Sequence, residues 1–318
     1  MNQLSEVRRV DTSTARARRY PGDSIFATLA MLAGLTIALS LAAVFVFLTL
    51  QGFPGLHADR SVFSPGATNF WSYAAKLLFG TTLAAVLAMA IAVPFAIGIA
   101  LFITQFAPKR IAAPIAYLID LLAAVPSVVF GLWGARALAH ASLPMQTWLN
   151  AHLGWIPFFS GQVTATGRTI LIASVVLAIM VLPIATAICR EVFQQTPTLQ
   201  KEAALGIGAT QWEMIRLTVF PHARSGMVAG MMLGLGRALG ETMAVAMVLS
   251  ASAPVVTLHM LTAENPPTIA SNIANNYNSE DTRIQSVLIA TGLVLFLFTF
   301  VVNFMARRIV ARSERRFS

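Results

Sequence analysis

Two side chains of opposite charge, Arg237 and Glu241, interrupt an apolar run that extends from Gly226 to Ser250. Their spacing of four residues makes them neighbours on a helix. A guanidinium group suits oxyanions because its planar fork donates two parallel hydrogen bonds. Ionisable groups within a membrane usually face a solute route or a bundle interior. We therefore expect Arg237 to line the route of an anionic solute, with Glu241 holding the guanidinium or gating access. A structural ion pair that locks two helices together is the alternative.

Other reactive groups are few. The single cysteine, Cys189, allows no intrachain disulfide and no cysteine-based metal site. The five histidines lack the His-x-x-x-His spacing of zinc hydrolases, and no lysine follows a glycine, so a Gly-Lys-Ser/Thr phosphate loop is absent. The polar groups within the apolar runs lack a His or Lys partner that could activate a nucleophile. We expect no enzyme activity, no bound metal and no cofactor in this chain.

The composition excludes an ordinary soluble protein. Of 318 residues, 57% are hydrophobic and 11% charged, and the mean hydropathy is +0.72. A soluble domain carries about 25% charged residues. The net charge of +9 could indicate nucleic acid binding. In so apolar a chain, however, arginines at the ends of apolar segments indicate the cytoplasmic face of a membrane. We expect an integral membrane protein and no nucleic acid partner.

Six apolar runs are long enough to cross a hydrocarbon core of roughly 30 Å as helices. They are Ile25–Leu50, Leu77–Ala107, Ile111–Gly134, Thr169–Cys189, Gly226–Ser250 and Ile284–Ala306. The first run exceeds the h-region of a signal peptide, so we expect an uncleaved anchor. Within the third, Pro126 predicts a kink. For Asp120 in the same run, pairing with a neighbouring helix or reaching the interface is favoured over solute contact.

The Lys and Arg residues are distributed unequally between the two sides of these runs. Sixteen of the 22 lie on one side and five on the other, and Arg237 lies within a run. This asymmetry predicts that both termini are cytoplasmic. Residues 1–24 form a polar cytoplasmic tail. The loops 51–76, 135–168 and 251–283 then face outward, and their Gly, Pro, Asn and Ser content predicts turns and irregular chain.

The segment 190–225 is of mixed charge and carries apolar residues at helical spacing. Thr196 is a plausible N-cap, with Pro197 at the first helical position. Two short helices meeting near Gly206–Gly208 would present an apolar knob at the membrane surface. An amphipathic helix lying in the interface is the simpler alternative.

Gly226, Gly230 and Gly234 follow this segment at intervals of four. That spacing lets two membrane helices approach closely. Steps of three and four along the same face lead on to Arg237 and Glu241. We expect one continuous helix in which the glycine stripe runs into the charged pair.

The order of residues in the mixed-charge segment resembles the EAA loop of binding-protein-dependent ABC importers. The matching positions are Glu202, Ala203, Ala204, Gly208 and Pro221. Ahead of the proline, Thr218 and Phe220 replace the Ile and Leu of the family pattern. The resemblance implies a coupling helix that sits in a groove of a cytoplasmic ATPase dimer, which would use ATP and Mg.

Two further strings resemble phosphate-specific (Pst) ABC transporter permeases, and the overall length with its extra first span is similar to the PstC-type subunit. The strings are residues 121–134 (LLAAVPSVVFGLWG) and 234–245 (GLGRALGETMAV). The resemblance implies an all-α, type I ABC importer permease fold in the bacterial cytoplasmic membrane. It divides the chain into an extra helix at 25–50, a core at 73–307 with the EAA loop at about 196–221, and a cytoplasmic tail at 308–318.

The function implied by the resemblance is ATP-driven uptake of inorganic phosphate by alternating access. The implied partners are a PstA-type permease, a PstB-type ATPase dimer and a PstS-type extracytoplasmic phosphate-binding protein. One arginine does not distinguish phosphate from sulfate, molybdate or phosphonate, so a permease for another oxyanion remains the alternative. A secondary, ion-coupled anion transporter is a further alternative, although it would leave the long charged segment without a role.

Overall fold

The computed structural model describes residues 21–63, 67–249, 256–264 and 266–314, and within these ranges all regular structure is helical. Most of the expected N-terminal tail (1–20) and the last residues of the C-terminal tail (315–318) lie outside the described residues. The α-helices are α1 (Pro21–Leu56), α2 (Phe70–Leu101), α3 (Lys109–Ala124), α4 (Ser127–Trp133), α5 (Ala139–Ala141), α6 (Leu143–Leu153), α7 (Ile170–Gln194), α8 (Thr198–Gly206), α9 (Gln211–Met214), α10 (Phe220–Gly240), α11 (Met243–Val248), α12 (Ile269–Asn276) and α13 (Thr282–Glu314). π-Helical turns at Phe102–Phe106, Gly134–Leu138 and Ile215–Val219 and a 3-10 turn at Arg60–Val62 complete the fold.

The chain forms two compact units, residues 1–47 and 48–318. The described part of the first unit is the N-terminal portion of α1, whose side chains from Gly22 to Phe47 are all exposed. This portion is strongly apolar, so its surface suits lipid or another membrane helix. α1 begins before the expected Ile25 and continues through Pro54 to Leu56, where the composition predicted a turn.

In the second unit, α2 and α7 pack side by side along their length. Alanines spaced four residues apart on α2 are at most 1% exposed: Ala84, Ala88, Ala92, Ala96 and Ala100. The facing part of α7 buries Val176, Leu177 and Val181 in the same core. Small side chains on one helix let the backbones approach closely, which is how membrane helices associate without a hydrophobic driving force.

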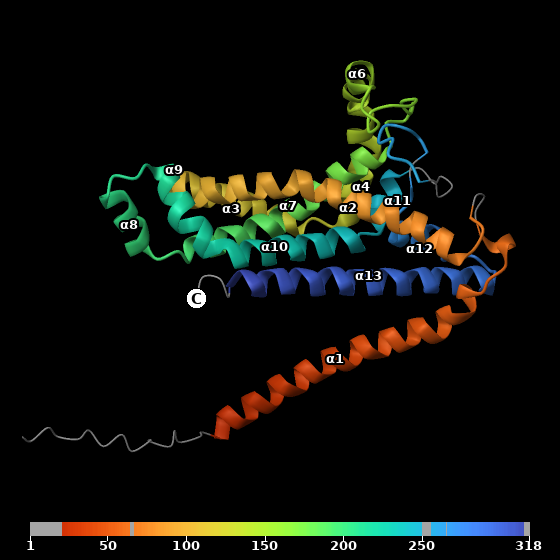
Figure 1. Ribbon diagram of the computed structural model, residues 1–318, viewed down its shortest axis with the longest axis horizontal. Coiled ribbons are helices and arrows are strands. Elements are labelled where there is room, and N and C mark those ends of the chain that lie inside the picture. The colour runs from red at the N-terminus through yellow and green to blue at the C-terminus, as the bar shows by residue number, and fades with distance from the viewer. Residues whose placement is uncertain (1–20, 64–66, 250–255, 265, 315–318) are drawn as a thin grey trace, which may run out of the picture. The chain divides into compact units, whose positions relative to one another are not determined.

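The helices of residues 48–318 place their connections at two opposite ends (Figure 1). The α2–α3 turn, α8, α9 and the last turns of α13 lie at one end; α4, α6, α11 and α12 lie at the other. This grouping matches the division of loops derived from the Lys and Arg distribution. The two ends therefore carry the two sets of loops that the sequence separates.

The number of helices that can cross a membrane falls short of six. The described residues contain four helices that are long and apolar enough to cross a membrane: α1, α2 with its π turn, α7 and α13. The bent pair formed by α3 and residues 127–141 gives a fifth if it is one span. The fifth predicted span, Gly226–Ser250, is the part not confirmed. α10 ends at Gly240 rather than continuing to Ser250, and its glycines and arginines make it less apolar.

Pro126 lies at a sharp bend, as its position predicted. α3 and the helical residues 127–141 are inclined at 92°. Val125 is extended (φ −68°, ψ 128°), the conformation that a following proline favours. The bend turns the chain out of the direction of α3 and starts α4.

The glycine stripe of α10 lies against α7. A Cβ atom added at Gly230 would lie 2.9 Å from Ile188 Cγ2, and one at Gly234 would lie 2.7 Å from Val181 Cγ1. A Cβ atom added at Gly226 would lie closer still to Cγ1 of Val192, which also belongs to α7. The packing of α10 on α7 therefore requires glycine at these positions.

The buried stripe continues to Ala238, which is 5% exposed, and not to Arg237, which is exposed. The expectation that the glycine face runs into the charged pair is therefore wrong. The reason is geometric: a step of four from Gly234 stays close to the packed face, whereas a step of three turns Arg237 away from α7.

Prediction for the stripe. Replacing Gly234 with alanine should lower the thermal stability of the purified protein, because the new methyl group meets Val181, which is fully buried. Overpacking of this kind costs about 1–3 kcal/mol. Gly236 is the matched control, since a Cβ there meets nothing within 4 Å. Alanine at Gly236 should leave the melting temperature unchanged or raise it, because glycine is a poor helix former. Equal losses in the two variants would contradict the assignment of the packed face.

Candidate functional site

The end of α10 is a break in the helix, not a continuous turn. Glu241 is extended (φ −69°, ψ 125°), and α11 begins at Met243. Glu241 Oε1 accepts a hydrogen bond from the backbone N–H of Ala244 at 3.2 Å, and the Thr242 hydroxyl donates to the Gly240 carbonyl at 3.1 Å. Glu241 thus caps α11, and the expected i, i+4 pairing with Arg237 is wrong because the two residues no longer share one helix.

Arg237 occupies the last turn of α10, where a cation is favoured by the helix dipole. Its side chain is exposed, and no ion pair in the described part of the chain includes it. The guanidinium group is therefore not committed to a carboxylate among the residues that the structure describes. An arginine held in this way at a helix break can bind an anion through its planar fork.

The two strings that carried the family resemblance meet in space. α11, from the second string, packs against α4, from the first. Gly131 allows this contact, because a Cβ atom there would lie 2.7 Å from Ala244 Cα; one at Gly134 would lie 2.6 Å from Val176 Cγ2. The break after α10 and the bend before α4 are thus parts of one packed arrangement.

Arg168 completes that arrangement and was treated in the sequence only as a loop residue. Its Nε donates to the Val248 carbonyl at 3.2 Å, and its Nη2 donates to the Met247 carbonyl. These carbonyls lie at the C-terminal end of α11, where they have no partner within the helix. No spacing signal links Arg168 to α11, because the contact joins residues about 80 positions apart.

An ion pair within the bundle joins Asp120 of α3 to Arg190 of α7. Arg190 Nη2 lies 3.4 Å from both carboxylate oxygens of Asp120. The Asp120 side chain is 51% exposed and the Arg190 side chain is 22% exposed. Pairing of Asp120 with a neighbouring helix was the favoured expectation, and the structure confirms it. Its partner was not identified, because Arg190 had been assigned to the charged segment.

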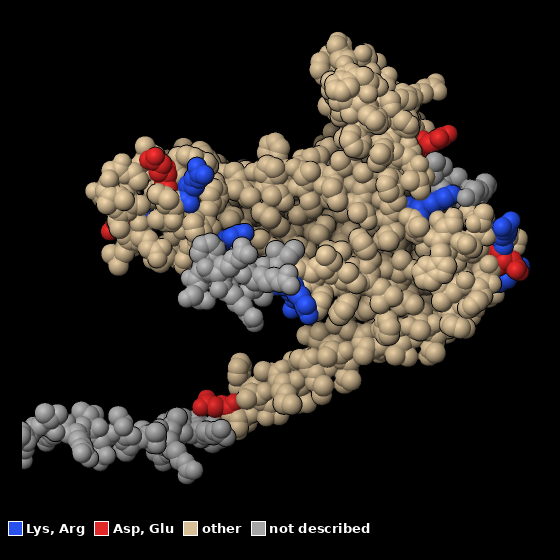
Figure 2. Space-filling model, in the orientation of Figure 1, with Lys and Arg blue, Asp and Glu red and all other residues tan. Residues whose placement is uncertain are grey.

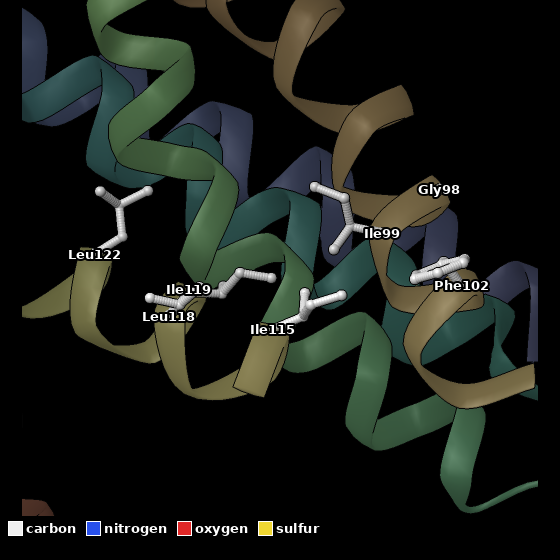
Figure 3. A pocket seen from close by; sticks show the side chains of 7 residues that line it. All are labelled: Gly98, Ile99, Phe102, Ile115, Leu118, Ile119 and Leu122. Atoms are coloured by element: carbon white, nitrogen blue, oxygen red, sulfur yellow. The ribbon is translucent and has the colours of Figure 1, made fainter. Parts of the chain in front are cut away.

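An apolar groove of about 450 Å³ lies between the end of α2 and α3 (Figure 3). Its lining side chains are aliphatic or aromatic: Ile99, Phe102, Ile115, Leu118, Ile119 and Leu122, with Gly98 at its edge. It offers an anion no charged group, so we place no anion site there. In the described ranges, no three His, Cys, Asp or Glu side chains come close enough to hold a metal ion.

The mixed-charge segment folds into two short helices with a tight turn between them, as expected. α8 ends in a Schellman motif: Gly208 N–H donates to Leu205 O at 3.0 Å, and Ala209 N–H donates to Ala204 O at 3.2 Å. Gly208 has φ +89°, which explains glycine at this position of the EAA loop. The N-cap prediction was off by one residue: Pro197 precedes α8, and Thr196 is buried, with no hydrogen-bond partner for its hydroxyl.

α9 begins with a capping box between Thr210 and Glu213. The backbone N–H and then the hydroxyl of Thr210 lower the pKa of Glu213. A lowered carboxyl pKa means that this stabilisation is present above the unfolded pKa and is lost as the pH falls through the folded value. The box fixes the direction of the turn between α8 and α9.

The two helices rest on the ends of α2 and α7 and expose an apolar face. Ala204 is buried in a cluster with Phe193 and Ile215. Leu199 and Ile207 are 76% and 85% exposed. Glu202 and Ala203 are also exposed, and Pro221 lies in the first turn of α10. An exposed apolar face at the end of a bundle is suited to contact with a partner protein.

Comparisons with known proteins agree with these features. Residues 92–315 match the family described as "Binding-protein-dependent transport system inner membrane component". "Phosphate transport system permease protein PstC 2" of Mycobacterium tuberculosis is 43% identical over 303 residues, which is 92% of each chain. The "Phosphate transport system permease protein PstC" of Haemophilus influenzae is 35% identical over 92% of this chain and 94% of that protein.

A solved structure supports the fold. A chain of a bacterial alginate ABC transporter, in complex with an alginate pentasaccharide-bound periplasmic protein, superposes with a TM-score of 0.64 at 14% sequence identity. The match covers 92% of this chain and 95% of that chain. Together, the apolar helices and the family match define an integral membrane component of a transport system. The chain belongs to the family of binding-protein-dependent transport system inner membrane components.

Prediction for the ion pair. Asp120→Ala and Arg190→Ala should each destabilise the protein, and the double variant should lose less than the sum, because each single change leaves an unpaired charge. Groups in direct contact couple by about 0.5–3 kcal/mol in such cycles. The measurement is thermal unfolding of the purified protein. Arg283→Ala, which breaks the exposed pair with Asp281 but keeps the hydrogen bond from the backbone N–H of residue 283 to Asp281, is the control and should have little effect. Strictly additive losses at 120 and 190 would show that the pair contributes nothing.

Proposed function

We propose that this chain is a permease subunit of an ATP-driven ABC importer that moves inorganic phosphate across the cytoplasmic membrane by alternating access. The proposal is supported by the relatives, which are named phosphate transport permeases and cover almost the whole chain. In this reading the chain is a translocation subunit, and a partner hydrolyses ATP. A permease for sulfate, molybdate or phosphonate is the competing assignment.

The observation that carries the anion assignment is the helix break after Gly240. It leaves Arg237 exposed and without a carboxylate partner among the described residues. We assign Arg237 to the substrate route, where its fork would hold two phosphate oxygens. Glu241 belongs to the same route as the residue that fixes the break, since it caps α11. Broken helices of this kind often form solute sites in transporters.

The face formed by α8 and the following turn is the proposed contact with a cytoplasmic ATPase dimer that uses ATP and Mg. Glu202, Ala203, Ala204 and Gly208 form the coupling helix and its end, and Pro221 starts the helix that leads away from it. The exposure of Leu199 and Ile207 supports this role. A second permease of the PstA type and an extracytoplasmic phosphate-binding protein of the PstS type complete the proposed assembly.

The orientation proposed here places both termini and α8 in the cytoplasm. The Lys and Arg excess on that side supports it. Membrane orientation can be measured directly by labelling single cysteines with an impermeant reagent in intact cells, because the natural chain has only Cys189, which is buried.

Prediction for the substrate. The complex that co-purifies with this chain, reconstituted in lipid with its binding protein, should hydrolyse ATP faster with phosphate than with sulfate. Arg237→Ala should abolish uptake of phosphate while the complex still assembles. Arg224→Ala, an exposed arginine at the other end of α10, is the control and should transport normally. Stimulation by another oxyanion would reject phosphate but keep the importer. Normal uptake by Arg237→Ala would remove the proposed anion site.

Prediction for coupling. Glu202→Lys and Ile207→Asp should each reduce co-purification of the ATPase. The first reverses a charge and the second introduces one on the exposed face formed by α8 and the following turn. Glu191→Lys makes the same charge change at an exposed position in the last turns of α7 and should retain the ATPase. Unchanged co-purification in both coupling variants would count against a coupling helix. If no ATPase accompanied even the natural chain, an ion-coupled secondary transporter would become the better assignment.

A further inference from the structure

A charge-free segment projects from the bundle between α5 and α7. It comprises residues 143–167, named here the α6 arm, and Figure 1 shows α6 standing away from the helices around it. No Lys, Arg, Asp or Glu occurs between Arg136 and Arg168. On the visible face of the molecule, the projecting part carries no charged side chain (Figure 2). Neither the anion site nor the coupling surface makes use of this arm.

The arm is an ordered unit held by side-chain amides. The Asn150 amide donates to the carbonyls of Phe159 and Gly161 at 2.7 and 3.0 Å, which ties the loop after α6 back onto the helix. Gln146 is fully buried, and its amide donates to Gly167 O at 3.0 Å. The loop also pairs with residues 256–262, since Met260 N–H donates to Phe158 O at 2.8 Å. The amide-bearing side of α6 is therefore turned towards the arm's own loop.

The opposite side of α6 and the turn that follows it present large apolar side chains. Met145 and Trp148 of α6 are 47% and 55% exposed, and Trp155, in the turn after α6, is 79% exposed. His152 lies between the two tryptophans in the sequence and stacks on Trp148, with the ring centroids 4.7 Å apart. Exposed aromatic side chains grouped in this way need an apolar or half-apolar environment.

The position of the arm indicates that this environment is the membrane surface. α3 is part of a candidate span, and the helical residues that follow it turn by 92° before they reach the arm. Helical residues at a right angle to a helix that follows the membrane normal run parallel to the membrane plane. Tryptophan is enriched at this level, because its ring is apolar and its N–H needs a polar partner.

We propose that the α6 arm is an interfacial anchor that lies at the boundary between headgroups and acyl chains, with Trp148 and Trp155 inserted into it. The absence of charge favours lipid over a protein partner. A surface that docks a soluble protein is expected to carry a polar, charged rim, and this arm has no charged side chain. The arm would fix the depth of the α3–α4 bend, and with it the level of α4 and α11.

Spin labels on the full complex in phosphatidylethanolamine–phosphatidylglycerol nanodiscs test this proposal. Cysteine is introduced singly at Met145, Trp148 or Trp155 in a Cys189→Ala background, and collision with oxygen and with a water-soluble nickel chelate is measured. Trp212→Cys is the matched control, since Trp212 lies in α9 at the other end of the bundle and is also 55% exposed. The Met145→Cys variant keeps both tryptophans, so it reports even if a tryptophan variant does not assemble.

Oxygen collisions should exceed nickel collisions several-fold at 145, 148 and 155, with depths at the headgroup level, and the order should reverse at 212. Free access of nickel at the arm would overturn the proposal. Nickel access that is lost only when the extracytoplasmic binding protein is added would show a protein docking surface instead. Exclusion of both reagents would show that another membrane subunit covers the arm, which also rejects a lipid anchor.

Discussion

A backbone group that leaves a helix within a membrane must find a partner inside the protein, because lipid offers none. The break after α10, which we assign to the proposed solute route, meets this requirement with three side chains. Thr242 satisfies the Gly240 carbonyl, Glu241 satisfies a free N–H of α11, and Arg168 satisfies the last carbonyls of α11. The string Gly-Glu-Thr that carried the family resemblance therefore has a structural role in this chain: it ends one helix and starts the next. Arg237 is left out of this network, which is why its guanidinium stays available.

The second requirement is close approach of the helices that surround the break. Alanines on α2 and glycines on α10 place both helices against α7, and Gly131 brings α4 against α11. In each case one partner contributes a side chain no larger than a methyl group. Since apolar association gains little within lipid, this contact must come from shape. The bundle is consequently defined by where small residues recur, more than by where large apolar residues occur.

Much of this could be predicted from the sequence. Hydropathy located the long helices, the glycine spacing identified the packed face of α10, and Pro126 marked the bend. The helical periodicity of the sequence gave a wrong prediction where a break in the backbone ends α10. A stretch that is helical by composition gave Arg237 and Glu241 a shared face, and only the extended conformation of Glu241 separates them. The partners of Arg168 and Asp120 could not be predicted either, because those contacts join residues 70 or more positions apart. Sequence periodicity carries no information at that range.

The arrangement also links the two regions of the proposed importer. α10 runs without interruption from the coupling segment to Arg237, a distance of roughly 25 Å at the rise of an α-helix. Its glycine stripe fixes it to α7, and α7 in turn joins α3 through the Arg190–Asp120 pair. A movement of α8 and α9 can therefore reach the helix break only if α7 and α10 move together. The side chains of Val181 and Ile188 on α7 pack directly on the glycine backbone of α10, which makes the two helices a rigid pair with little room for sliding. In the proposed cycle, an ATPase that displaces the coupling helix would shift the arginine as part of this pair and not by bending α10 alone.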